Sequence, residues 1–142
     1  MCLMLYLGVS KPMTPFRHRT ENHQVILRRT SRKQLPTQIV EKAHCYFIAD
    51  YDCSCIFLPG GPGCPLDEYT IKARERLIEI ADAALKIDQN ALLFSEWLGD
   101  APDSGPIERQ VSPSDFAHDR VWEGVSDAHI FYHLSSTQRA TP

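Results

Sequence analysis

Two apolar runs separated by a short acidic turn stand near the middle of the chain. Residues 44–49 are rich in β-branched and aromatic side chains and predict one strand, and residues 53–58 predict a second. The residues between them, Asp50-Tyr51-Asp52, supply the turn chemistry of a tight hairpin. Because side chains alternate along a strand, we expect Cys53 and Cys55 to share one face of this hairpin.

Other apolar runs predict the remaining strands. Residues 3–7 form a continuous apolar run that ends at Gly8, which predicts a central strand buried on both faces. Shorter patterns predict strands at residues 23–27, at residues 91–98 and at residues 107–111, the last two as hairpin partners. Residues 128–134 fit a closing strand or a helix, because the segment is too short for its period to decide.

A three- and four-residue spacing of apolar positions predicts one long helix, from an Asp67 N-cap to about Lys86. Its apolar stripe contains Ala73, Leu77, Ile80, Ala81 and Ala84, and the opposite, solvated face is expected to hold Lys72, Arg74, Glu75, Arg76 and Glu79. Ser112 and Pro113 predict the start of a short second helix that ends near Arg120. Residues 37–42 fit either an irregular turn or a single helical turn.

These elements together predict an α+β fold. We expect a mainly antiparallel sheet of about five or six strands, with one long helix packed on a face. A chain of 142 residues with neither repeat nor linker is expected to form a single domain over residues 1–142, with a frayed tail at residues 135–142.

Composition adds the class of protein and its expected location. With 43% hydrophobic and 23% charged residues, the chain is typical of a globular protein. No apolar stretch approaches the roughly 18 residues that a membrane span needs, and the apolar start is too short for a signal peptide. We therefore expect a cytoplasmic protein, in which five cysteines are free thiols, a metal site or a redox pair rather than a disulfide framework.

Charge is distributed unevenly along the chain. Residues 1–42 hold eight Lys/Arg against two Asp/Glu, a net +6, whereas residues 43–142 hold seven against sixteen, a net −9. The basic stretch 17–33 predicts either a solvated face or a surface for an acidic protein partner, with Arg28, Arg29, Arg32 and Lys33 as its candidate residues. An overall charge of −3 and the single nearby aromatic, Phe16, argue against a nucleic-acid surface.

The cysteines are the main candidates for chemistry. Cys53 and Cys55 at this spacing either fill core positions, form a redox pair, or supply two thiolates to a soft metal such as zinc. A zinc ion needs four ligands, or three and a water molecule. The candidates that complete the shell are Cys64, Cys2, and either His44 or Cys45.

Several short motifs resemble a group of small uncharacterised bacterial proteins. The motifs are the opening MCLMLYLG, the Pro12/Pro15 loop, the strand before DCSC, and the later FSEWLGD and ERQVSPSDF. The resemblance implies a bacterial cytosolic protein of similar layout and no particular activity. That group is expected to carry glycines around its two cysteines, and the residues Asp52, Ser54 and Ile56 found here favour a plain strand instead.

The sequence thus predicts a small cytosolic α+β domain with a cysteine site for thiol redox chemistry or metal binding. The alternative is a non-enzymatic interaction module that uses the basic 17–33 surface. No acid–base pair, nucleophile elbow or phosphate loop is found, which favours a protein that is not an enzyme.

Overall fold

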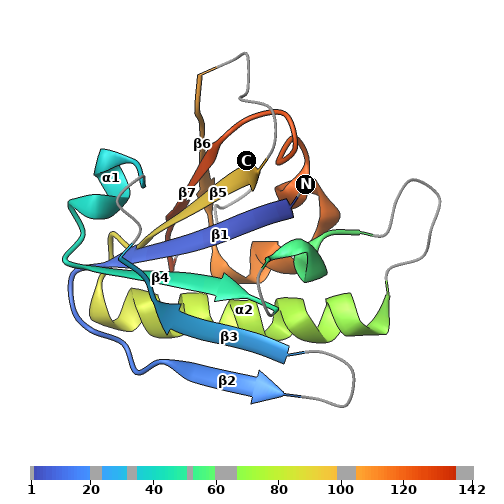
Figure 1. The fold of residues 1–142 in the computed structure, drawn as a ribbon, viewed down its shortest axis with the longest axis horizontal. Coiled ribbons are helices and arrows are strands. Elements are labelled where there is room, and N and C mark those ends of the chain that lie inside the picture. The colour runs from blue at the N-terminus through green and yellow to red at the C-terminus, as the bar shows by residue number, and fades with distance from the viewer. Residues whose placement is uncertain are drawn as a thin grey trace.

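The computed structural model describes residues 2–19, 24–31, 35–50, 53–59, 67–98 and 105–136. They form an α+β fold in which a seven-stranded mixed sheet packs against one long helix (Figure 1). The strands are β1 (Cys2–Val9), β2 (Phe16–Arg19), β3 (Gln24–Arg29), β4 (His44–Ala49), β5 (Leu92–Leu98), β6 (Ile107–Val111) and β7 (Ile130–Leu134). The helices are α1 (Thr37–Val40) and α2 (Glu68–Ile87), with the 3-10 turns η1 (Cys55–Phe57), η2 (Pro113–Ala117) and η3 (Asp119–Trp122).

The strand order is β2-β3-β4-β1-β5-β7-β6, which places β1 at the centre. β1 pairs antiparallel with β4 on one side and with β5 on the other, so the prediction of a central strand is confirmed. The sheet is mostly antiparallel, as predicted, but it has more strands than the five or six expected.

The added strand is β2, which the apolar pattern does not mark. All four of its residues are exposed, and its sequence is Phe-Arg-His-Arg. A strand at the margin of a sheet need not bury either face, so its sequence need not show the alternation of apolar and polar residues that predicts a strand.

The predicted hairpin between residues 91–98 and 107–111 is wrong. β7 lies between β5 and β6, and β6 pairs parallel with β7. Four of the five β7 residues are buried, whereas three of the five β6 residues are exposed. The more apolar strand therefore takes the inner place, and the polar strand takes the margin.

The second strand of the predicted cysteine hairpin is also wrong. Residues 55–57 form the 3-10 turn η1, and the pairing after β4 is limited to one isolated bridge between Asp50 and Cys53. The residues that follow bond to β1 through their side chains, as described below, so they do not continue a regular ladder.

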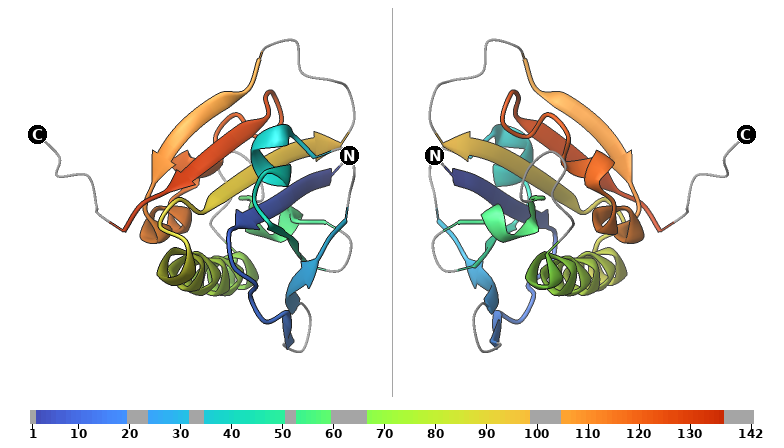
Figure 2. Two further views of the ribbon diagram at one scale, coloured as in Figure 1. Left: turned by 90° about the vertical axis from the view of Figure 1, so that its left-hand side faces the viewer. Right: turned by 90° about the vertical axis from the view of Figure 1, so that its right-hand side faces the viewer.

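Two apolar layers cover the sheet, which curves around α2 (Figure 2). The face toward α2 carries alternate β1 residues such as Leu5 and Leu7, together with the predicted helix stripe. The opposite face packs Tyr6, Phe47 and Phe94 against Ile39 of α1. No helix in the described part of the chain is long and apolar enough to span a membrane.

α2 begins as predicted, because the Asp67 side chain accepts a hydrogen bond from the Tyr69 N–H at 2.7 Å. The prediction of a solvated Arg74 is wrong, since this side chain is only 1% exposed. It lies beside the apolar stripe, and backbone carbonyls and an aspartate accept hydrogen bonds from its Nε and Nη1, as described below. Ser112 and Pro113 do start a helical segment, which runs as η2 and η3 rather than as one helix.

Candidate metal centre

Three cysteines from two separate segments of the chain converge at one end of β1. Cys2 opens this strand, Cys53 closes the bridge after β4, and Cys55 begins η1. Their Sγ atoms all lie within 4.8 Å of one another, and all three residues are partly exposed. None of the three forms a disulfide. The structure therefore brings together three of the six predicted candidates.

Backbone hydrogen bonds fix the path of the chain through this site. Asp50 and Cys53 exchange N–H···O bonds of 2.8 and 3.2 Å, which turn the chain back toward β1. The Ser54 N–H then donates to the Leu3 carbonyl at 2.7 Å. These bonds hold Cys53 and Cys55 beside the first residues of β1.

Side chains of the same segment accept hydrogen bonds from backbone N–H groups in the first half of β1, where its pairing with β4 ends. β4 pairs with β1 only over Leu5–Val9, so the first residues of β1 need other partners on that side. The Leu3 N–H donates to Cys55 Sγ at 3.2 Å, and the Leu5 N–H donates to Ser54 Oγ at 2.9 Å. The Ser54 hydroxyl in turn donates to the Ile48 carbonyl. Ser54 and Cys55 thus replace the carbonyls of a neighbouring strand.

Arg74 of α2 donates hydrogen bonds that hold the residues after Cys55 in place. Its Nε donates to the Phe57 carbonyl at 2.7 Å, and its Nη1 donates to Asp119 at 2.8 Å. Its guanidinium carbon lies 5.7 Å from the centre of the Trp122 ring, which stacks on the Phe57 ring with centroids 5.7 Å apart. Arg74 therefore fixes the end of η1, two residues from Cys55.

Burial decides the protonation of Cys55. Burial raises the pKa of its thiol to about 11, although the Leu3 N–H acts in the opposite direction, and the Cys53 and Cys2 thiols raise it further. Cys55 is therefore a protonated thiol at neutral pH. A bound cation would reverse this, because a coordinating thiol loses its proton to the metal.

The spacing of the sulfurs suits a metal ion. With Zn–S bonds of about 2.3 Å, the sulfurs of a tetrahedral site lie about 3.8 Å apart. The observed limit of 4.8 Å means that the sulfurs need to approach one another by only about 1 Å. Three thiolates and one water molecule, or a fourth residue, complete such a shell.

Of the other predicted ligands, His44 and Cys45 are not part of this cluster. His44 pairs with Val9, seven residues along β1 from Cys2, which corresponds to a distance of about 23 Å. Cys64 lies outside the described residues, so its role as a ligand stays a prediction. The fifth cysteine, Cys45, donates its thiol hydrogen to the Ile39 carbonyl at 3.2 Å.

The predicted basic surface is described only in part. Arg28 and Arg29 are exposed at the end of β3, where the Arg28 guanidinium lies 5.0 Å from the centre of the Phe47 ring. Arg32 and Lys33 lie outside the described residues.

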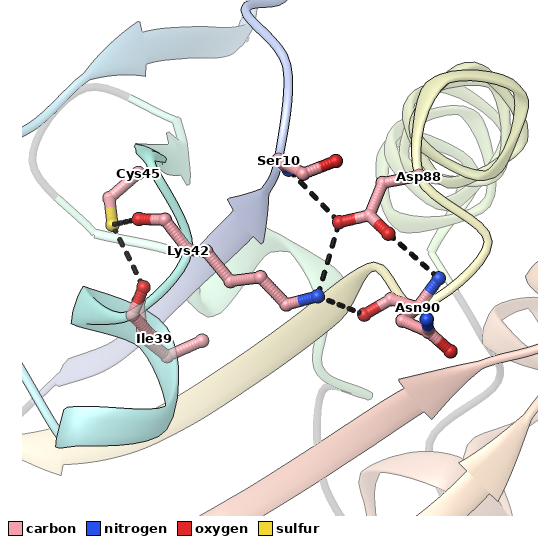
Figure 3. Close-up of polar contacts among 6 residues, drawn as sticks. All are labelled: Ser10, Ile39, Lys42, Cys45, Asp88 and Asn90. Carbon is pink, nitrogen blue, oxygen red and sulfur yellow. Dashed lines mark hydrogen bonds and ion pairs between the residues drawn. The ribbon is translucent and has the colours of Figure 1, made fainter.

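A second polar cluster holds the opposite end of β1 (Figure 3). Asp88 Oδ2 accepts hydrogen bonds from Lys42 Nζ at 3.1 Å and from the Ser10 N–H at 2.9 Å, and Oδ1 accepts one from the Asn90 N–H. Lys42 also donates to the Asn90 carbonyl at 2.7 Å. Every group in this cluster has a structural partner, so the cluster joins α2, β1 and β4 rather than forming a reactive site.

Sequence reasoning missed two residues that shape the cysteine site. Ser54 stands between the cysteines and looks like an ordinary strand residue in the sequence. Its role depends on hydrogen bonds to Leu5, 49 positions away, and to Ile48, six positions away. Arg74 did carry a signal, since it directly follows Ala73 of the apolar stripe and so borders the buried side of the helix.

Comparison of the chain with known protein families, with curated proteins and with solved structures finds no match.

Proposed function

We propose that this protein binds one thiophilic metal ion, Zn²⁺, through the thiolates of Cys2, Cys53 and Cys55. The observation that carries the proposal is the convergence of three sulfurs within 4.8 Å from two separate segments of the chain. Cys53 and Cys55 lie close together simply because they are two residues apart, whereas Cys2 comes from a strand more than fifty positions away. Soft thiolate ligands select zinc and copper(I) over hard cations.

Metal binding accounts for this site better than thiol redox chemistry does. A redox-active cysteine needs a thiol whose pKa is lowered, so that the thiolate is present to attack. Burial raises the pKa of Cys55 instead. The Leu3 N–H that points at Cys55 Sγ is the kind of outer hydrogen bond that stabilises a coordinated thiolate.

The proposed role of the ion is structural. Within the described ranges, no histidine or carboxylate joins the three sulfurs, so no acid or base stands beside the ion. The ion would join the first residue of β1 to η1, which Arg74 already fixes to α2. We propose a small non-enzymatic domain of this kind in a reducing compartment such as the bacterial cytosol, where free thiols persist.

The test is metal content together with single cysteine replacements. Protein purified in reductant without chelators should contain about one zinc per chain by elemental mass spectrometry. Cobalt(II) exchange should give the near-ultraviolet charge-transfer band of thiolate ligands. Cys2→Ser, Cys53→Ser and Cys55→Ser should each lower zinc affinity by at least about tenfold in competition with a chromogenic chelator.

Cys45→Ser is the matched control, because this thiol bonds to a carbonyl and lies outside the cluster. It should leave zinc affinity unchanged. Metal-free protein that does not take up added zinc would refute the proposal, as would binding that survives all three cluster variants. Cys64→Ser then separates a four-thiolate shell, in which one thiolate contribution to the cobalt band is lost, from three thiolates and water.

A further inference from the structure

A groove of about 390 Å³ separates the margin of the sheet from α2. One wall comes from the chain that leads into β2, with Pro12, Met13, Thr14 and Phe16. The other wall comes from α2, with Glu79, Ile80, Ala83 and Ile87. Most of these side chains are apolar, and the groove lies far along the sheet from the start of β1.

β2 forms one margin of the sheet (Figure 1). It pairs antiparallel with β3 and, among the described residues, with no further strand. The outer edge of a terminal strand presents backbone N–H and C=O groups to which an extended chain can be added.

The two faces of β2 differ in chemistry. Phe16 pairs with Leu27, which belongs to the apolar layer under α2, so Phe16 lies on the groove side of the sheet. Arg17 pairs with Ile26, and Arg19 pairs with Gln24, so both arginines lie on the opposite face. A chain added beside β2 would therefore meet apolar groups on one face and cations on the other.

Edge protection does not account for this arrangement. Charged side chains blunt the edges of many sheets, and the two arginines alone fit that role. Phe16 does not, because a protected edge has no use for an aromatic side chain that is 38% exposed and lines a groove.

The groove wall is held in place before any ligand arrives. The buried hydroxyl of Tyr46 accepts a hydrogen bond from the Met13 N–H at 2.7 Å and donates one to the Met13 carbonyl at 3.0 Å. A wall that is already ordered avoids part of the entropy loss that accompanies binding.

Charge identifies the kind of partner. Arg17 and Arg19 are exposed and form no ion pair with any described residue. The carboxylate in the groove, Glu79, pairs with Arg76 at 2.7 Å, which offsets its charge. Two cations without an ion pair among the described residues thus lie on the face of β2 opposite the apolar groove, and this arrangement complements an acidic segment.

We propose that the groove and the outer edge of β2 bind an extended segment of an acidic partner protein, in which acidic and apolar residues alternate. The apolar side chains enter the groove against Phe16 and Ala83. The acidic side chains, on the other face of the added strand, contact Arg17 and Arg19. This site is separate from the cysteine cluster and does not depend on a metal.

The probe is a fluorescein-labelled peptide, Glu-Val-Glu-Phe-Glu-Val-Glu, and the readout is fluorescence anisotropy with the full chain. A block peptide of the same composition, Glu-Glu-Glu-Glu-Val-Phe-Val, and a form N-methylated at alternate residues are the controls. The alternating peptide should bind at least about tenfold more tightly than either control, and its binding should weaken as salt increases.

Variants locate the binding site. Phe16→Asp, Ala83→Glu and Arg17→Glu should each weaken binding by about tenfold. Arg120→Glu makes the same charge change at an exposed site on η3 and should have less than about a twofold effect. Ala83 is exposed on α2, so its variant tests the groove even where Phe16→Asp disturbs β2.

Three results would overturn the proposal. The first is an alternating peptide that does not bind at about 1 mM, which is weaker than any specific use requires. The second is equal binding of the alternating and block peptides. The third is self-association of the chain that Phe16→Asp abolishes, because the groove would then hold a second copy rather than an acidic partner.

Discussion

Replacement of Ser54 by alanine tests how the cysteine segment is joined to the sheet. The Ser54 hydroxyl accepts from the Leu5 N–H and donates to the Ile48 carbonyl, and Ser54, Leu5 and Ile48 are all fully buried. Alanine keeps the backbone bond of Ser54 to the Leu3 carbonyl but removes both side-chain bonds. The buried Leu5 N–H and the buried Ile48 carbonyl then each lose one hydrogen bond.

The magnitude follows from those two groups. A buried donor or acceptor that loses its partner costs about 1–3 kcal/mol. Since no solvent reaches Ser54, water does not replace the hydroxyl, and the two losses together amount to about 2–6 kcal/mol. This is a large share of the roughly 5–15 kcal/mol that stabilises a typical domain, and it corresponds to a fall in Tm of about 7–20 °C.

Urea unfolding followed by tryptophan fluorescence and by circular dichroism measures the change. The midpoint should fall while the slope of the free energy of unfolding against urea stays constant, because both states keep their exposed area. Zinc affinity should fall in the same variant, since Ser54 positions the cysteines on either side of it.

Ser10→Ala is the matched control. It makes the same chemical change at an exposed residue beyond the other end of β1, where the backbone N–H, not the hydroxyl, bonds to Asp88. Its effect should stay within about 0.5 kcal/mol. A loss below about 1 kcal/mol for Ser54→Ala, or equal losses for the two variants, would refute the reasoning.

Three further predictions concern the elements around the site. Burial raises the pKa of Asp88, but the hydrogen bonds from Asn90, Lys42 and Ser10 outweigh burial, so the pKa is lowered overall. The ionised carboxylate therefore stabilises the fold above about pH 4, and this contribution is lost as the pH falls through the lowered pKa. Asp88→Asn should make the free energy of unfolding, measured in urea, depend less on pH in the acid range. A Cβ at Gly8 would lie 2.9 Å from Lys42 Cγ, so Gly8→Ala should cost about 1–3 kcal/mol, and a double-mutant cycle with Lys42→Ala should recover part of it. Arg74→Met leaves the Phe57 carbonyl without its donor and should cost about 1–3 kcal/mol in thermal unfolding, with an accompanying loss of zinc affinity that a purely local defect would not produce.

The sequence was informative where one element buries one apolar pattern. The central strand β1 and the helix α2 follow directly from a continuous run and from a three- and four-residue stripe. Both signals are local, because the side chains that define them lie within one element.

The sequence was uninformative where the outcome depends on distant partners. β2 has no buried face that an apolar pattern could mark. The order of β6 and β7 depends on which of the two strands is more buried, and the pattern of one strand alone does not show this. At the cysteine site, the residue pair 53 and 55 was visible, but the approach of Cys2 depends on the pairing of Ser54 with β1. Hydrogen bonds between a side chain and a distant strand leave no periodic trace.

The parallel pairing of β6 with β7 has a consequence for synthesis on the ribosome. β6 emerges about twenty residues before β7, yet β7 is the strand with which it pairs. During that interval β6 has no sheet to join, and an unpaired strand is open to association with other chains. Its polar, charged sequence, Ile-Glu-Arg-Gln-Val, suits such a delay, because charged strands aggregate slowly. We therefore expect the charges of β6 to limit association of the nascent chain as well as to blunt the finished margin of the sheet.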